Sequence, residues 1–381
     1  MSAPAYPSAI LVVGGYGVVG SQVCRLLRER HPTVPLLIGG RNPEKAASLA
    51  RELGAKPVCV DTSEADPLAL LDERVGLVLS AVNDPRDAML LAAVRRGIAL
   101  VDITRWTARL HTALLRLSAE HLSAPVILAS GWMAGVAPLL AVAAARQVWP
   151  PQSIEIDILY GASDLAGPDS IDYVDRLDVP FEVSDKGRER LVRPFTDGHV
   201  VTFPDGRRRR TYRLDTPEQA TLPIVTGAST VATRIVFDSL LATAALVAFK
   251  RLGVIRLLSA ESFTRLRRTL LFPQGSGPPG EGTAAVVLVT VRGARGTVRA
   301  SIVDRRGQSH LTALGAVIAA ERVLGLDGLP GAVRGVTFPE QHPQPQTALT
   351  TLREHGGEIA IETVESSDAA VISGVAERCG R

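Results

Sequence analysis

Cysteines and long apolar runs are scarce in this chain of 381 residues. The three cysteines, Cys24, Cys59 and Cys379, form no CxxC pair, which argues against a disulfide framework or a structural zinc site and favours a reducing cytoplasm. No HExxH motif or paired histidine spacing is present, so we expect no bound metal. The longest apolar run, 240–249, has about half of the roughly 20 residues that a spanning helix needs, and we expect no stable membrane insertion.

Lysine is scarcer still, because nearly all of the basic residues are arginine. The lysines are Lys45, Lys56, Lys186 and Lys250. This distribution argues against catalysis by a Schiff-base lysine or by a Lys–His acid–base pair. The net charge of +3 is small for the length, and no uniformly basic segment indicates nucleic acid as a partner.

The first 149 residues alternate strand and helix patterns in the order of a parallel sheet with crossover helices. The expected strands are 9–13, 35–38, 57–60, 76–81, 99–103 and 125–129. The expected helices are 18–30, 42–53, 85–96 and 107–121. Six strands connected in this way predict an α/β fold with a doubly wound parallel Rossmann sheet that binds a dinucleotide.

From about residue 150 the pattern changes to hairpins. Strand patterns at 200–203 and 207–214 flank the turn sequence Pro204-Asp205-Gly206, and strand patterns at 284–292 and 297–303 flank residues 293–296. We therefore expect a second, α+β domain with a mixed or antiparallel sheet. The expected limits are 1–149 for the Rossmann domain, 150–309 for the second domain, 310–365 for a return to the first, and 366–381 for a flexible tail.

A G-x-G-x-x-G motif follows the apolar strand pattern "ILVV" directly and opens an apolar helix pattern. The first glycine permits a tight turn, the second lets a pyrophosphate approach the backbone, and the third lets helix and strand pack closely. The amides at the helix start favour an anion. The predicted contacts to the pyrophosphate are Gly15, Tyr16, Gly17, Val18, Val19 and Gly20.

The stretch "LIGGRNPEK" ends the second expected strand with Gly39, Gly40 and Arg41. An NAD-specific fold places an acidic residue there to bind the ribose hydroxyls. Glycine would instead leave room for a 2′-phosphate, and a guanidinium can bind that group through two charge-assisted hydrogen bonds. We therefore predict NADP as the cofactor, with Arg41, Asn42 and Lys45 near the 2′-phosphate. The alternative is that the two cations are solvated residues at a helix start.

Three further residues end neighbouring strands. Asp61 closes the third strand and is expected near the adenine, or alternatively caps a helix or loop. Val82 and Asn83 follow the fourth strand, at the edge of the sheet where the nicotinamide half of the cofactor would lie.

Four segments together resemble the saccharopine dehydrogenase-like, or saccharopine reductase-like, oxidoreductases. They are "ILVVGGYGVVG", "IGGRNPEKAASLA", "LVLSAVNDPRDAMLLAAVRRGIALVDITRW" and "ILASGWMAGVAPLLA". The resemblance covers roughly the first 145 residues. It implies a Rossmann domain, a second domain whose sheet supports a homodimer, and pyridine-nucleotide chemistry on carbon–nitrogen bonds of amino acids. Ala134 departs from the family, which usually has proline there, and Trp132-Met133 replaces a different pairing.

The sequence offers three candidates for the substrate side of the reaction. Asp102, at the end of the fifth strand, could donate a proton to a ketone, although it could equally cap a helix. Tyr173 is a second proton donor candidate, and Trp132 could wall the pocket or belong to the core. Carboxylate anchors could come from Arg234 or from one face of a hairpin, which alternatively guards an exposed edge; the residues of that face are Arg208, Arg210 and Tyr212.

These features predict an NADP(H)-dependent oxidoreductase. It would transfer hydride to a carbonyl, imine or amino-acid-like small molecule, such as one that carries a carboxylate, in the cleft between the domains. One alternative is a lyase, transferase or cyclase that keeps NADP as a bound cofactor or scaffold. The other is a non-catalytic NADP-binding sensor.

Overall fold

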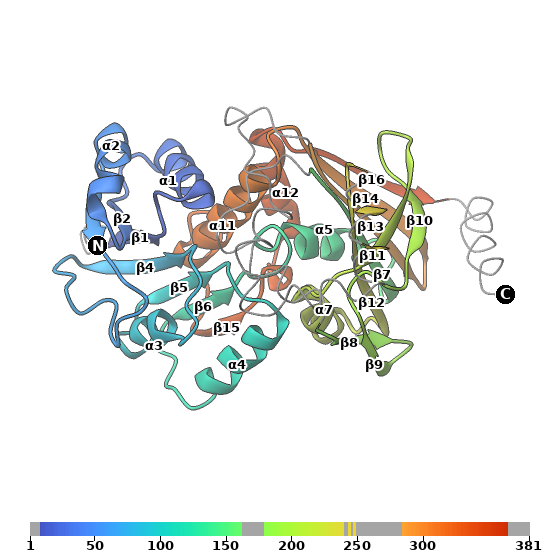
Figure 1. Ribbon diagram of the computed structural model, residues 1–381, viewed down its shortest axis with the longest axis horizontal. Coiled ribbons are helices and arrows are strands. Elements are labelled where there is room, and N and C mark those ends of the chain that lie inside the picture. Colours follow the sequence, from blue (N-terminus) through green and yellow to red (C-terminus); the bar gives the residue numbers. More distant parts are fainter. Residues whose placement is uncertain (1–7, 162–178, 240–242, 245–246, 249–283, 365–381) are drawn as a thin grey trace. The chain divides into compact units, whose positions relative to one another are not determined.

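The computed structural model describes residues 8–161, 179–239, 243–244, 247–248 and 284–364 (Figure 1). The chain forms two compact units. The first comprises Met1–Val136 and Thr312–His342, and the second comprises Ala137–Leu311 and Pro343–Arg381. The segment expected to be a flexible tail lies outside the described residues.

The first unit is built on a seven-stranded parallel sheet with the order β15-β6-β5-β4-β1-β2-β3. Its strands are β1 (Ala9–Val13), β2 (Leu36–Gly40), β3 (Lys56–Cys59), β4 (Val75–Ser80), β5 (Ala99–Asp102), β6 (Pro125–Leu128) and β15 (Gly335–Thr337). The six predicted strands and their doubly wound order are confirmed. A seventh strand, β15, comes from the C-terminal part of the chain and pairs with β6.

Helices cover both faces of this sheet. Helices α1 (Val18–Arg30) and α2 (Pro43–Leu53) lie on one face, and α3 (Ala88–Arg95) and α4 (Thr107–Leu117) lie on the other (Figure 1). The central strands are therefore largely apolar, and all five residues of β1 are buried, whereas the outer strand β3 begins with the exposed Lys56. Each fully buried aliphatic side chain stabilises the fold by about 1.5–3 kcal/mol relative to an exposed one.

The second unit contains a mixed seven-stranded sheet with the order β10-β11-β12-β7-β13-β14-β16. Its strands are β7 (Pro151–Tyr160), β10 (His199–Thr202), β11 (Arg208–Arg213), β12 (Thr230–Phe237), β13 (Ala285–Gly293), β14 (Gly296–Asp304) and β16 (Glu358–Val364). Strands β7 and β12 are parallel and the other pairs are antiparallel. Strands β8 (Phe181–Asp185) and β9 (Arg188–Val192) form a separate hairpin. Both predicted hairpins, β10–β11 and β13–β14, are confirmed.

The C-terminal part of the chain is shared between the units. Helix α11 (Gln308–Leu324) and the 3-10 helix η2 (Pro339–Gln341) precede α12 (Pro345–Glu354). The expectation that 310–365 as a whole returns to the first domain is wrong for β16. This strand pairs with β14 over seven residues and so extends the second sheet.

Two more helices complete the described structure. Helix α5 (Val136–Ala145) follows β6, and α7 (Glu218–Thr226) packs on β12, where its Gln219 side chain accepts from the Thr233 amide (3.0 Å). None of the helices in the described ranges is long and apolar enough to cross a membrane.

Candidate functional site

The glycine motif forms the loop between β1 and α1. Gly17 is the N-cap of α1, and its amide donates to the Gly14 carbonyl (2.9 Å). A Cβ atom at position 20 would lie 2.1 Å from the Gly14 carbonyl oxygen, so only glycine allows the helix to approach the loop this closely. The six motif residues therefore lie together at the carboxyl edge of the sheet, where a Rossmann fold binds its ligand.

The start of α1 is suited to an anion. Gly17 offers no side chain to cap the helix, and the first turn contains no acidic residue. The first amides of a helix lack intrahelical acceptors, and the helix dipole places partial positive charge there. The amides of Val18 and Val19 are thus available to hold a phosphate group.

The buried side chain of Cys24 packs against this loop. Its thiol donates to the Gly15 carbonyl (3.6 Å), and burial raises its pKa to about 12. A thiol with that pKa remains neutral at physiological pH, so Cys24 has a packing role in the loop.

The two glycines at the end of β2 lie against neighbouring side chains. A Cβ atom on Gly40 would lie 2.4 Å from the Tyr16 ring, and one on Gly39 would lie 2.9 Å from a Leu11 methyl group. A larger residue at either position would therefore collide with one of these side chains. The Tyr16 hydroxyl accepts from the Asn42 amide (3.2 Å), which joins the glycine loop to the start of α2.

Arg41 and Lys45 lie close together in the chain at this same edge. Both side chains are exposed or half-buried, and neither has an ion-pair partner within the described part of the chain. The Asn42 carboxamide oxygen accepts from the Glu44 amide (3.0 Å) and so caps α2. Its NH₂ group remains free to donate, and the two cations supply positive charge beside it.

Asp61 lies near two arginines from neighbouring loops. The Ser63 amide donates to its carboxylate (2.8 Å) and lowers the pKa of that carboxyl, and Arg41 and Arg86 lower it further. The ends of β2, β3 and β4 thus bring together one carboxylate and two guanidinium groups. Arg86 did not stand out in the sequence, because its proximity to Asp61 depends on the folding of separate loops.

Val82 and Asn83 follow β4 as expected, and both contact other parts of the site. The Val82 side chain lies beside Gly14: a Cβ atom on Gly14 would be 2.4 Å from a methyl group of Val82. The Asn83 side-chain oxygen accepts from Arg109 (2.7 Å). Arg109 comes from α4, so this bond connects the loop after β4 with the next crossover helix.

Asp102 belongs to a buried ion-pair cluster. Its carboxylate accepts from the Thr104 amide (2.9 Å), the Thr104 hydroxyl (2.8 Å) and the Arg105 Nε atom (2.8 Å). Asp102 is only 2% exposed, and Arg105 only 1%. Arg105 also donates to Asp87, which accepts from Arg109 as well (2.9 Å). This geometry favours the alternative that Asp102 is structural, since its hydrogen bonds orient its own neighbours.

A second buried carboxylate lies beside this cluster. Asp84 accepts hydrogen bonds from three successive amides at the start of α3, those of Ala88 (2.9 Å), Met89 (2.9 Å) and Leu90 (3.3 Å). Burial raises the pKa of Asp84, and these amides counteract the effect. Asp84 therefore fixes the start of α3, next to the loop that carries Asn83.

The loop after β6 has an unusual backbone. Met133 and Ala134 have positive φ angles of 55° and 52°, and Gly135 follows at 90°. Such conformations cost about 1–3 kcal/mol each in non-glycine residues and often occur at functional sites. They also explain a departure from the family pattern, because a proline ring fixes φ near −65° and could not occupy position 134. Trp132, half-buried, begins this loop.

The remaining sequence candidates divide in two. Tyr173 lies outside the described residues. Arg208 and Arg210 are exposed on β11 and Tyr212 is half-buried, but β11 pairs with β10 and β12 and so is not an edge strand. Arg209, Thr211 and Arg213 face the other side and are buried.

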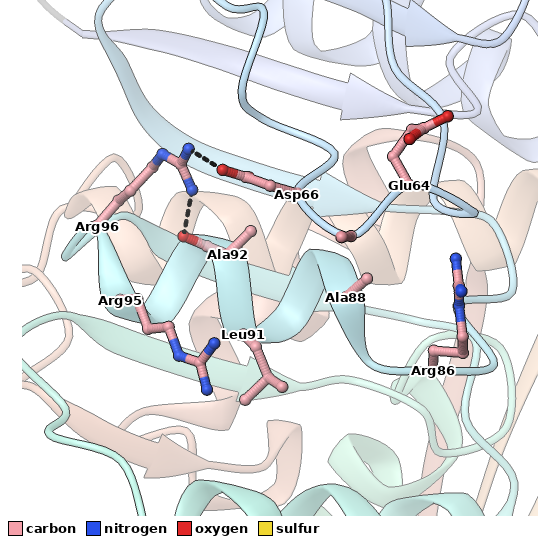
Figure 2. Close-up of a pocket in the computed structure, with 9 residues that line it drawn as sticks. Glu64, Asp66, Arg86, Ala88, Leu91, Ala92, Arg95 and Arg96 are labelled. Carbon is pink, nitrogen blue, oxygen red and sulfur yellow. Dashed lines mark hydrogen bonds and ion pairs between the residues drawn. The ribbon is translucent and has the colours of Figure 1, made fainter.

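A pocket of about 300 Å³ lies apart from the glycine loop, between α3 and the loop after β3 (Figure 2). Helix α3 lines one side of the pocket with Ala88, Leu91 and Ala92. Arg96 donates to Asp66 (2.5 Å) across it. The predicted cofactor residues do not line this pocket, so its volume alone does not identify the functional site.

The parallel sheet, its strand order and the glycine loop define the first unit as a Rossmann-type nucleotide-binding fold. The whole chain is similar to the structure of saccharopine dehydrogenase (L-Glu forming) from Saccharomyces cerevisiae. The TM-score is 0.65 with 14% sequence identity, over 94% of this chain and 100% of that chain. This likeness shows the fold that the sequence resemblance implied.

Another similar structure is an amine dehydrogenase from Mycobacterium smegmatis. It has a TM-score of 0.47 and 12% identity, over 88% of this chain and 95% of that chain. That score is too low to support an argument. No protein-family model matches the chain, and no curated protein matches it in sequence.

Proposed function

We propose that the protein is an NADP(H)-dependent oxidoreductase. The observation that carries the proposal is the edge formed by the glycine loop and the end of β2, where Arg41 follows Gly40 and no carboxylate occupies the position that binds ribose hydroxyls in NAD-specific folds. The residues fit the cofactor. Gly20 allows a close helix start, and the amides of Val18 and Val19 would hold the pyrophosphate.

Arg41 and Lys45 would bind the 2′-phosphate, and Asn42 would donate from its side-chain NH₂ group. A guanidinium binds phosphate through two parallel hydrogen bonds, and an ammonium adds a point charge. Val82 and Asn83 would lie near the nicotinamide half. The cofactor would supply a hydride, and the protein would orient the acceptor and exclude water around it.

The acceptor that best fits this chain is an imine or a related carbonyl compound, as in the carbon–nitrogen chemistry that the family resemblance implies. Asp102 is engaged with Arg105 and Thr104, so it is poorly placed to donate a proton. A protonated imine needs no acid from the protein, because hydride addition to its carbon yields the amine directly. The first substrates to test are therefore a small imine, or an oxo acid together with an amine that condenses with it to form an imine.

Isotope transfer tests the reaction directly. NADPH carrying deuterium at the reactive carbon is incubated with the protein, a panel of oxo acids and amines, and the product is examined by mass spectrometry. We expect one deuterium in the amine product and an equal loss of reduced nicotinamide absorbance. Product formed without deuterium and without net NADPH consumption would instead support a non-redox enzyme that retains the nucleotide.

A further inference from the structure

The second unit contains two neighbouring buried arginines on one face of its sheet. Arg213 ends β11 and is paired in register with Arg234 on β12. Their exposed fractions are 3% and 6%, so both guanidinium groups are more than nine-tenths buried. Because paired residues on adjacent antiparallel strands project from the same face, the two cations lie side by side.

The carboxylates around this pair do not satisfy it. Asp197 accepts from Arg213 (2.9 Å) and also from Arg190 (2.9 Å). Arg234 has no carboxylate within hydrogen-bond distance in the described structure, because its ion pairs with Asp197 and Glu155 are 3.9 Å and 3.7 Å long. Glu155 lies closer to a third residue, Arg292 (3.1 Å).

One nitrogen of each guanidinium is buried without a hydrogen-bond partner. Among the described residues, nothing accepts a hydrogen bond from Nη1 of Arg213 or from Nη1 of Arg234. A buried donor without an acceptor, and a buried charge without a close counter-ion, both cost free energy. Arg105 in the first unit also has one buried nitrogen, Nη2, without a hydrogen-bond partner among the described residues, but two buried carboxylates accept from its other nitrogens and compensate its charge.

Burial and a neighbouring cation act against the charge on Arg213, whereas Asp197 favours it. Burial lowers the pKa of the Arg213 guanidinium, and the neighbouring Arg234 lowers it further. An arginine nevertheless stays protonated in proteins, so the charge persists and attracts an anion.

The loop that carries Asp197 is held in an uncommon conformation. Phe195 and Asp197 have positive φ angles of 56° and 51°. The loop is fixed against β11 by two backbone hydrogen bonds, from Phe195 to the Arg213 carbonyl (2.8 Å) and from Arg213 to the Thr196 carbonyl (3.1 Å). The Arg234 Nε atom donates to the Asp197 carbonyl (3.2 Å). These bonds preorganise both guanidinium groups.

We propose that Arg213 and Arg234 form a binding site for an oxyanion, a carboxylate or phosphate group of a small ligand. The ligand oxygens would accept from the two Nη1 atoms and bring an anion closer to Arg234 than Asp197 and Glu155, whose carboxylates lie 3.9 Å and 3.7 Å from it. Two adjacent guanidinium forks match the geometry of such groups. The site belongs entirely to the second unit and is independent of the proposed nucleotide site.

Calorimetric titration with inorganic phosphate and with glutarate tests the proposal, at constant ionic strength with chloride as the balancing anion. Phosphate could also bind at Arg41, so the titrations are made in the Arg41→Glu variant as well as in the unaltered protein. We expect at least one of the two anions to bind both proteins. The anion that binds more tightly identifies the ligand class, and binding of neither anion to Arg41→Glu would overturn the proposal.

Substitutions then locate the site. Arg213→Gln and Arg234→Gln are each expected to weaken binding about tenfold or more, the loss typical of a charge-assisted hydrogen bond. Arg234→Lys keeps a cation in place if the glutamine variant does not fold, and it should also bind more weakly because the fork is lost. Arg210→Gln is the matched control, since Arg210 is exposed on the same strand as Arg213 and, among the residues described, donates only to the Gly198 carbonyl. Unchanged binding in folded Arg234→Lys, or an equal loss in Arg210→Gln, would contradict the assignment.

Discussion

Arg41→Glu is expected to weaken NADPH binding about a hundredfold while leaving NADH binding unchanged or improved. The substitution removes the guanidinium that would bind the 2′-phosphate and places a repelling carboxylate there. NADH has no such phosphate, and a carboxylate at the end of β2 can accept from its ribose hydroxyls. Calorimetric titration of the unaltered protein and of Arg41→Glu with each nucleotide measures both effects.

A matched control separates this local contact from a general change of charge. Arg51→Glu reverses a charge near the end of α2, the helix that begins just after Arg41, and Arg51 is exposed and donates only to the Ala47 carbonyl among the residues described. It lies eight residues beyond Pro43, the first residue of α2, or about 12 Å along the helix axis. We expect Arg51→Glu to alter NADPH affinity only slightly. Similar losses in the two variants would show that Arg41 makes no specific contact.

Asp102→Asn is expected to destabilise the folded protein by about 3 kcal/mol. The substitution keeps the shape of the side chain but removes the charge that faces Arg105, which is only 1% exposed. Loss of one partner leaves a buried charge undercompensated. Urea denaturation followed by circular dichroism measures the change. As a control, Asp61 is half-buried and accepts from the Ser63 amide, so Asp61→Asn should cost only about 1 kcal/mol.

A double substitution tests whether the loss arises from the ion pair. Replacing Arg105 with methionine as well removes the undercompensated charge, so Asp102→Asn with Arg105→Met should be less destabilised than the sum of the single variants. Asp87 keeps its ion pairs with Arg109 (2.9 Å) and Arg116 (3.1 Å) in this variant. If Asp102→Asn were fully stable yet inactive, Asp102 would have to be considered as a proton donor again.

Six of the seven strands in the first sheet were predictable because each of them carries a local signal. The apolar runs of β1, β2 and β4 are bounded by glycine or polar residues, and the crossover helices alternate with them. Strand β15 has only three residues, all of intermediate burial, and pairs with a strand about 200 positions earlier in the chain. No local pattern encodes such a pairing. The return of β16 to the second sheet was missed for the same reason.

The candidate site was predictable to a similar degree. The glycine loop and the cation at the end of β2 can be identified from neighbouring residues in the sequence. The Tyr16 ring fills the space beside Gly40, and this contact joins positions 24 residues apart in the chain. The burial of Asp102 likewise depends on Arg105 turning back toward it and on Asp87 from a separate loop. Spacing indicates which residues end a strand, but their partners depend on the tertiary fold.

In the second unit, the residues of β11 alternate between an exposed and a buried face, and the sequence does not show which face is buried. Arg208 and Arg210 were considered as anchors because they share one face of β11, yet they are the exposed residues. The buried face carries Arg213, and the register with β12 places it beside Arg234. Arg234 was considered from the sequence, but its pairing with Arg213 depends on the order of the strands.

The nucleotide preference of the unaltered protein tests whether Arg41 and Lys45 bind the 2′-phosphate of NADP(H). NADPH and NADH are titrated into the same preparation under identical conditions, and the two dissociation constants are compared. We expect NADPH to bind at least about tenfold more tightly than NADH, since only NADPH offers a 2′-phosphate to Arg41 and Lys45. Equal affinity for the two nucleotides, or tighter binding of NADH, would contradict it.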